Sequence, residues 1–300
     1  MRHRPAWRRK AVNQAVEGIS ALVALIGCFL LAWILWVVIR EGCQAFSWRI
    51  FTEKTPPPVG DTETGPSGGL ANAIVGHLLI VGLATLLASP MGFMAGLYLA
   101  EFGRHSWVAT VVRFGANVLF GVPSIIIGLF IYVLLVVPHG GTGAPGYTGG
   151  YAGAYALAFI MLPIVARTAE DMLRLVPDTL REAAMAMGAA RWRTALIAAR
   201  AARTGILTGT LLAIARVGGE TAPLIFTAGF SQFPLDFRSA GALGESFASP
   251  TPNLTVTMYQ FAMSPYPNWI ALGWAGALLV TVGVLLLTVV ARLLLYWRTK

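Results

Sequence analysis

The chain has 300 residues, of which 56% are hydrophobic and only 12% are charged, and its formal net charge is +9. Soluble domains carry about 25% charged residues, so this composition excludes an ordinary soluble protein and indicates an integral membrane protein. The positive charge does not indicate a nucleic-acid-binding surface. The Lys and Arg residues gather at the ends of apolar segments, where they orient a chain in a membrane.

Apolar segments long enough to cross a bilayer predict an all-α integral membrane protein with six transmembrane helices. The expected spans are residues 19–39, 70–100, 107–137, 151–176, 194–217 and 268–296. Residues 1–18 form a basic tail before the first span, and residues 40–69 form a loop rich in Pro and Gly after it. The first span is longer than the apolar part of a secretion signal, and no A-x-A cleavage site follows it, so we expect it to be retained.

Basic residues predict the orientation of these spans. They gather in the N-terminal tail, in residues 166–203 and at the C-terminus, whereas residues 138–150 contain no Lys or Arg. The positive-inside rule therefore places both termini in the cytoplasm and the 40–69 loop in the periplasm. Residues 178–193, between the fourth and fifth spans, are expected to form a cytoplasmic helix.

Prolines occur within or beside several of the apolar spans, at Pro90, Pro123, Pro163 and Pro223. Each removes a backbone hydrogen bond, so we expect a helix kink at each position. Membrane proteins tolerate such kinks where neighbouring helices or a cavity satisfy the freed carbonyl groups. Kinked helices are frequent in transporters, but also in channels and membrane enzymes.

The segment REAAMAMGAARWR, residues 181–193, contains Glu182, Ala183 and Ala184, followed by Gly188 six positions after the glutamate. This pattern resembles the EAA motif of ABC importer permeases. In that family the segment is a coupling helix that docks on an ATPase subunit. The resemblance implies that these four residues couple the chain to a separate ATPase.

Three further segments are similar to the phosphate-specific permeases of that superfamily, of the PstA type. They are YLAEF at 98–102, GVPSIIIGLF at 121–130 and RVGGETAPL at 216–224. The similarity covers about residues 70–300 and implies the MetI-like, type I ABC importer permease fold in a bacterial inner membrane. One departure is Ala199-Arg200, which stands where such permeases usually carry Leu-Pro.

The resemblance also implies the partners of the chain. These are a homologous second permease (PstC-like), two copies of an ATPase (PstB-like) and a periplasmic phosphate-binding protein (PstS-like). The chain would be a translocation subunit and not an enzyme, with no cofactor of its own and with ATP-Mg on the ATPase. The residues agree with this division, because the sequence has no G-x-x-x-x-G-K-[ST] loop for ATP.

Arg216 and Glu220 stand at the end of the fifth span, where each charge costs about 2.5–3.5 kcal/mol at the bilayer centre. Four positions apart, they would share a helical face, and they could be an ion pair that merely neutralises both charges. Alternatively, Arg216 binds an anion, since its planar fork matches phosphate oxygens. On that hypothesis Glu220 holds Arg216 while the path is empty, and Thr221 follows on the same path.

Arg167 lies four positions after Pro163 in the fourth span. In the family that the chain resembles, an arginine near this place is linked to the phosphate path. The residues themselves also allow an ordinary cytoplasmic helix end, with Glu170, Asp171 and Arg174 as charged neighbours.

Two alternative functions stay open. Permeases for sulfate, molybdate, tungstate or phosphonate would share the same fold, and only the R-x-x-x-E-T-A-P-L segment favours phosphate, by resemblance. An intramembrane serine protease would use Ser67 of GPSGG, residues 65–69. A hydrolase serine turn needs a preceding strand, and here a Pro-rich loop precedes it. His77 is expected to pack or to hydrogen-bond between helices rather than to bind a metal.

Overall fold

The computed structural model describes residues 6–58, 68–104, 106–139 and 149–298, and these residues contain helices and no strand. The α-helices are α1 (Ala6–Ala45), α2 (Ala71–Leu97), α3 (Trp107–Gly121), α4 (Ser124–Ile131), α5 (Gly150–Arg174), α6 (Asp178–Ala186), α7 (Arg191–Val217), α8 (Ala222–Thr227), α9 (Ala240–Ala248), α10 (Leu254–Ala262) and α11 (Pro267–Arg298). Short helical segments of other types are η1 (Trp48–Phe51), η2 (Tyr98–Phe102), η3 (Tyr132–Val136) and η4 (Val137–His139). Ser67 and residues 140–148 lie outside the described residues.

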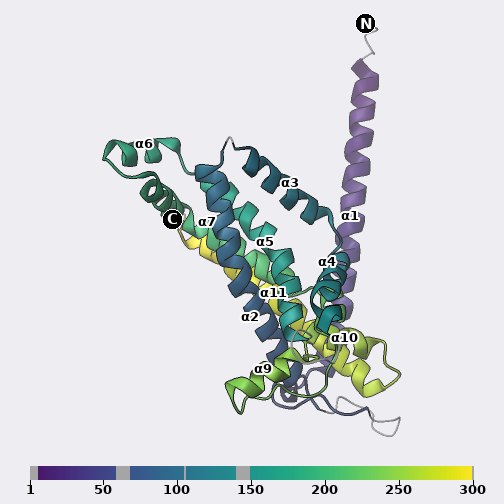
Figure 1. The fold of residues 1–300 in the computed structure, drawn as a ribbon. Coiled ribbons are helices and arrows are strands. Elements are labelled where there is room, and N and C mark those ends of the chain that lie inside the picture. Colours follow the sequence, from purple (N-terminus) through teal and green to yellow (C-terminus); the bar gives the residue numbers. More distant parts are fainter. Residues whose placement is uncertain (1–5, 59–67, 105, 140–148, 299–300) are drawn as a thin grey trace.

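Helix α5 is the centre of the bundle. It packs against α2 and α7, while α11 joins α7 to α1 and α10. In Figure 1, α6 and the C-terminal end of α11 lie toward one end of the molecule, and α9 and α10 lie toward the other. In the most apolar 18-residue stretch of α5, 67% of the residues are buried. In the corresponding stretch of α1, 0% are buried. The exposed apolar side chains of α1 are those expected of a helix in contact with lipid or another membrane helix.

Small residues allow α2 and α5 to approach each other closely. A side chain at Gly96 of α2 would collide with α5 at Ala166 and Ala169, and one at Gly92 would meet Val165. Small residues of this kind are typical of contacts between membrane helices. The close approach places the C-terminal end of α2 directly beside Glu170.

In the described ranges, five helices are long and apolar enough to cross a membrane. They contain residues 12–45, 71–102, 150–174, 191–217 and 267–293. The prediction of one continuous helix over residues 107–137 is wrong. The chain bends by 106° between Trp107–Gly121 and Ser124–Val136. The two halves make a sixth crossing only as a broken span. Val122 and Pro123 are both extended at the break, and a residue before proline disfavours the helical conformation.

The other prolines behave differently from one another. Pro90 and Pro163 lie inside α2 and α5, each of which continues past its proline. Pro223 does not kink a helix, contrary to the sequence-based expectation, because it lies in the first turn of α8. There its missing N–H costs nothing, and its fixed φ favours helix initiation.

Two predicted boundaries are also corrected. Helix α1 starts at Ala6, so no break separates a tail 1–18 from a first span 19–39. The helix expected at 178–193 ends at Ala186, because Gly188 has a φ of +82°. The N–H of Gly188 donates to the Met185 carbonyl at 2.9 Å, and that of Ala189 donates to the Ala184 carbonyl at 3.1 Å. These are the two bonds of a Schellman C-terminal motif.

Candidate functional site

A pocket of about 260 Å³ lies where the α3–α4 turn, α5 and the end of α7 meet, and we call it the α7 pocket. Arg216 and Glu220 line it together with residues 119–124 and Pro163. This volume is below the roughly 300–1,000 Å³ typical of pockets for drug-sized ligands, so the α7 pocket suits a small ion. Two of the segments that resemble phosphate permeases, 121–130 and 216–224, therefore form one site.

Arg216 and Glu220 share the pocket but not a helical face. Helix α7 ends at Val217, and Gly218-Gly219 turn the chain before Glu220. Arg216 is exposed and Glu220 is half-buried, and no ion pair joins them among the described residues. Both the neutralising i,i+4 pair and a resting contact between the two charges are therefore absent from this conformation. Arg216 thus lines the pocket together with Glu220, and it forms no ion pair with a carboxylate in the part of the chain that the structure describes.

The end of α7 is held by two side chains that the sequence did not single out for this role. Nε2 of His77, on α2, lies 2.9 Å from the carbonyl oxygen of Gly218. A carbonyl only accepts, so this nitrogen donates the hydrogen bond. The hydroxyl of Thr255, on α10, donates to the carbonyl of Glu220 at 3.2 Å. Both side chains are buried, and the expectation that His77 would bond between helices is confirmed.

Thr221 is not among the residues that line the α7 pocket. Its carbonyl accepts hydrogen bonds from the N–H groups of Leu224 at 3.1 Å and Ile225 at 3.2 Å, and so begins α8. The expected place of Thr221 on the substrate path has no support from this geometry.

Arg167 lies in a neighbouring pocket of about 250 Å³ between α2, α3 and α5, which shares Leu119 and Pro163 with the α7 pocket. Among the described residues, Arg167 has polar side-chain partners and Arg216 has none. Nη1 of Arg167 donates to Oδ1 of Asn117 at 3.4 Å, and its Nε lies 3.5 Å from Oδ2 of Asp171. The structure therefore brings Arg167 next to the pocket of Arg216 and Glu220, but not into it.

Helix α6 presents the predicted coupling residues unevenly. Glu182, Ala183 and Gly188 are exposed, whereas Ala184 is buried. The preceding residue, Arg181, is also buried, and its Nη2 lies 2.7 Å from Oε1 of Glu101. Hydrogen bonding to Glu101 raises the pKa of Arg181. No local sequence pattern predicts that Arg181 would be buried.

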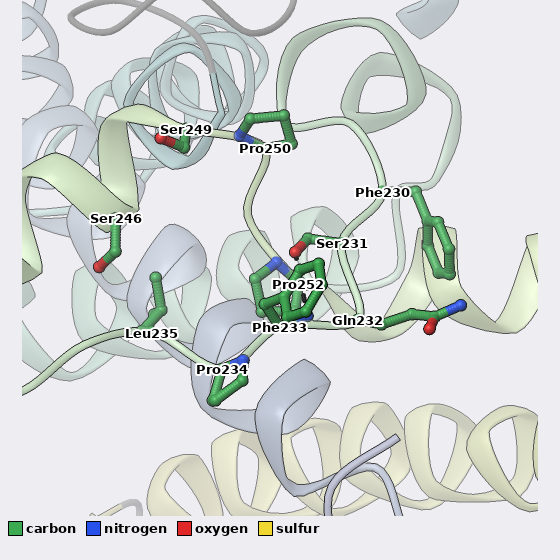
Figure 2. A pocket seen from close by; sticks show the side chains of 10 residues that line it. All are labelled: Phe230, Ser231, Gln232, Phe233, Pro234, Leu235, Ser246, Ser249, Pro250 and Pro252. Carbon is green, nitrogen blue, oxygen red and sulfur yellow. Dashed lines mark hydrogen bonds between the residues drawn. The ribbon is translucent and has the colours of Figure 1, made fainter. Parts of the chain in front are cut away.

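Another pocket, of about 560 Å³, lies at the end of the molecule opposite α6, between the loop after α8 and the α9–α10 connection. Figure 2 shows its lining side chains, and none of the 10 is charged. Ser246 accepts a hydrogen bond from the N–H of Asp236 at 3.1 Å. No candidate residue from the sequence lines this pocket, and it lacks the cationic group that an anion site needs.

The comparisons with known proteins agree with this geometry. The family model described as binding-protein-dependent transport system inner membrane component matches residues 89–297, more than half of the chain. The phosphate transport system permease protein PstA of Yersinia pestis is 46% identical over 294 residues, which cover 98% of this chain and 92% of the relative. The protein of the same name from Pasteurella multocida is 45% identical over 295 residues, which cover 97% of each chain.

Among solved structures, an inward-facing MetNI methionine ABC transporter matches with a TM-score of 0.59. The match covers 75% of this chain and 94% of the other. At 18% sequence identity, this likeness shows a shared ABC permease fold and nothing about substrate.

Proposed function

Because the chain belongs to the PstA family of phosphate transport permeases, within the inner membrane components of binding-protein-dependent transport systems, we propose that it moves inorganic phosphate from the periplasm to the cytoplasm. It is the translocation subunit of an ATP-driven importer, and a separate ATPase supplies the energy. Both chain termini and α6 face the cytoplasm in this proposal, as the distribution of basic residues favours. The α9–α10 end then faces the periplasmic phosphate-binding protein.

The α7 pocket is the observation that carries the proposal. Arg216 offers a planar set of N–H donors that matches two phosphate oxygens, and no carboxylate of the described residues forms an ion pair with it in this conformation. The pocket is small, and the Pro123 break and α5 enclose it from two sides. An anion would therefore meet the positive charge of Arg216 in a confined site between helices, where such an interaction is stronger than in water.

Glu220 favours phosphate over sulfate in the same pocket. At neutral pH phosphate keeps at least one proton, whereas sulfate keeps none. A carboxylate can accept a hydrogen bond from the phosphate O–H, but it repels an anion that has no hydrogen to donate. Sites built around such a bond reject analogues that lack the hydrogen. The negative charge of Glu220 also keeps phosphate from binding too tightly to leave.

Arg167 provides a second position on the path toward the cytoplasm. Its pocket adjoins the α7 pocket at Leu119 and Pro163. Its contacts with Asn117 and Asp171 are long, at 3.4 and 3.5 Å, and the side chain is half-exposed, so they compete only weakly with an arriving anion. A phosphate ion leaving Arg216 would meet Arg167 next.

Helix α6 is the surface for the ATPase. Its exposed residues include Glu182, Ala183 and Met185, and the neighbouring Met187 is 82% exposed. Exposed methionines beside charged residues are typical of surfaces that bind another protein. A homologous second permease completes the pathway, and each permease receives one ATPase subunit.

Phosphate uptake by intact cells tests the proposal. Cells whose own phosphate importer lacks only this subunit receive the chain, its Arg216→Gln variant or its Arg238→Gln variant. Arg238 is the matched control, because its side chain is 91% exposed and it loses the same charge. We expect the chain and Arg238→Gln to restore radiolabelled phosphate uptake, and Arg216→Gln to fall by at least about tenfold, the loss of one charge-assisted hydrogen bond.

The other outcomes separate the parts of the proposal. Equal uptake by an Arg216→Gln chain that inserts normally would remove the α7 pocket from the phosphate path. Uptake of radiolabelled sulfate or molybdate in place of phosphate by the unmodified chain would assign it to another anion. Insertion of each variant is measured by quantifying the chain in the membrane fraction.

A further inference from the structure

The buried side chain of Arg181 fixes α6 to the rest of the molecule. Its Nη2 and Nε donate hydrogen bonds to the carboxylate of Glu101 at 2.7 and 3.1 Å, in a bidentate arrangement. Its remaining donors reach the carbonyls of Leu173 at 2.7 Å and Val176 at 2.6 Å, at the end of α5. The side chains of Arg181 and Glu101 are only 9% and 7% exposed. A buried arginine with this many partners moves only together with them.

Glu101 belongs to η2, Tyr98–Phe102, a π-helical turn at the end of α2. A second arginine holds the same turn from another helix. Arg113, on α3, donates through Nη2 to the carbonyl of Leu99 at 2.9 Å and through Nε to Oε1 of Glu170 at 2.7 Å. The π turn is thus tied to α6 by one arginine and to α3 by the other.

Helix α3 leads from this turn to the α7 pocket. Arg113 lies near the middle of α3, and residues 119–123 at its C-terminal end line the pocket opposite Arg216. By contrast, the covalent link from α6 to α7 passes through exposed residues, and Gly188 within it has no heavy atom near its missing side chain. The firmer connection from α6 to the pocket is the one made by the two arginines.

We propose that Arg181 and Arg113, acting on the π turn 98–102, transmit movement of α6 to α3 and so to the α7 pocket. This inference rests on the proposed function, because it assigns the route by which an ATPase docked on α6 changes the site of Arg216. The π turn is the element that changes state. Each hydrogen bond of a π turn spans one residue more than a hydrogen bond of an α-helix. Displacement of Glu101 can therefore return the π turn to α-helical hydrogen bonding, which rotates the backbone at Leu99. Arg181, Glu101 and Arg113 are positioning residues, since none of them lines the α7 pocket, although Arg113 lines the neighbouring pocket of Arg167.

The test uses the complete transporter reconstituted in proteoliposomes, with phosphate uptake and ATP hydrolysis measured on the same preparation. The variants are Glu101→Gln and Arg113→Lys, with Glu17→Gln as the control. Glu17 is an exposed glutamate on α1, a helix that lies apart from α6. We expect Glu101→Gln and Arg113→Lys to keep the ATPase bound and hydrolysing, while the phosphate moved per ATP falls roughly 2- to 30-fold. In the double variant, the fold-decrease of the phosphate-to-ATP ratio should be smaller than the product of the two single fold-decreases, because both substitutions act on the same π turn.

Two results would contradict the inference. An unchanged phosphate-to-ATP ratio in both single variants would show that the arginines carry no coupling. Loss of the ATPase during purification of Glu101→Gln would show that the pair only positions α6 for docking. If Glu101→Gln does not insert into the membrane, the phosphate-to-ATP ratio of Arg113→Lys alone tests the inference. An unmodified transporter that hydrolyses ATP without moving phosphate would contradict the proposed function instead.

Discussion

Gly128 of α4 lies directly against Pro223 of α8, so closely that a side chain at position 128 would collide with the proline backbone. One residue comes from the GVPSIIIGLF segment and the other from the RVGGETAPL segment, 216–224. The contact fixes the α3–α4 turn against the chain that follows Arg216. The α7 pocket lies between these two segments and depends on their separation.

Replacing Gly128 by valine should therefore disrupt the pocket. The added side chain must push α4 away from α8, and overpacking of this kind costs about 1–3 kcal/mol. We expect a lower thermal unfolding temperature of the purified chain and little phosphate uptake. Gly82→Val is the control, because no heavy atom lies within 4 Å of a side chain at that position in α2. Equal uptake by both variants would mean that the α4–α8 spacing does not shape the site.

Charge removal at Glu170 should destabilise the fold more than charge removal at its neighbour Asp171. Oε1 of Glu170 is buried and lies 2.7 Å from Nε of Arg113 and 2.6 Å from Nη2 of Arg174. Glu170→Gln leaves the mostly buried Arg113 without a counter-charge, which costs about 3–5 kcal/mol. Asp171 is 51% exposed, and its pair with Arg167 contributes about 0–1 kcal/mol. Thermal unfolding of the two variants measures the difference, and equal unfolding temperatures would contradict it.

The sequence predicted the helical class and the charged site, but not the contacts that organise them. Long apolar runs reveal spans, and a charge inside such a run is conspicuous at Arg216. The pairing of Arg181 with Glu101 joins positions 80 residues apart, and no local pattern connects them. Helical spacing also gave the wrong relation between Arg216 and Glu220, since Gly218-Gly219 end α7 before the glutamate.

Proline positions illustrate the same limit. The residue type alone predicts a disturbed helix at Pro123 and Pro163 alike. The structure turns by 106° at the first and continues as α5 through the second. Pro163 lies in the most buried helix, whose neighbours hold it on several sides, whereas Pro123 lies in a half-exposed turn. Packing from distant segments decides between these outcomes.

His77 should matter for transport although it does not line the α7 pocket. His77→Phe removes the donor to the half-buried Gly218 carbonyl, and loss of this hydrogen bond costs about 1–3 kcal/mol at the end of α7. We expect reduced phosphate uptake with near-normal insertion. The control is Leu78→Phe, which places the same ring on the adjacent, 64% exposed position. Normal uptake by His77→Phe would show that α7 keeps its end without this bond.

Arg216→Lys should separate the charge of the arginine from its shape. Lysine keeps the positive charge but lacks the planar fork, so one of two hydrogen bonds to phosphate is lost. A charge-assisted hydrogen bond contributes about 1.5–3 kcal/mol, so the phosphate concentration for half-maximal uptake should rise roughly tenfold or more. Arg216→Gln should reduce uptake further. Identical kinetics for lysine and arginine would mean that only the charge is used.

Gly188 should tolerate asparagine better than valine, because its backbone conformation rather than its surroundings selects the residue. Its φ is +82°, and no heavy atom lies within 4 Å of a side chain there. The left-handed conformation costs an ordinary residue about 1–2 kcal/mol, least for asparagine and most for β-branched residues. Valine would therefore change the Schellman end of α6 and turn the helix relative to α7. Copurification of the ATPase with each variant measures this. We expect the amount of copurified ATPase to decrease in the order glycine, asparagine, valine. Equal recovery with all three would mean that ATPase binding does not depend on the orientation of α6.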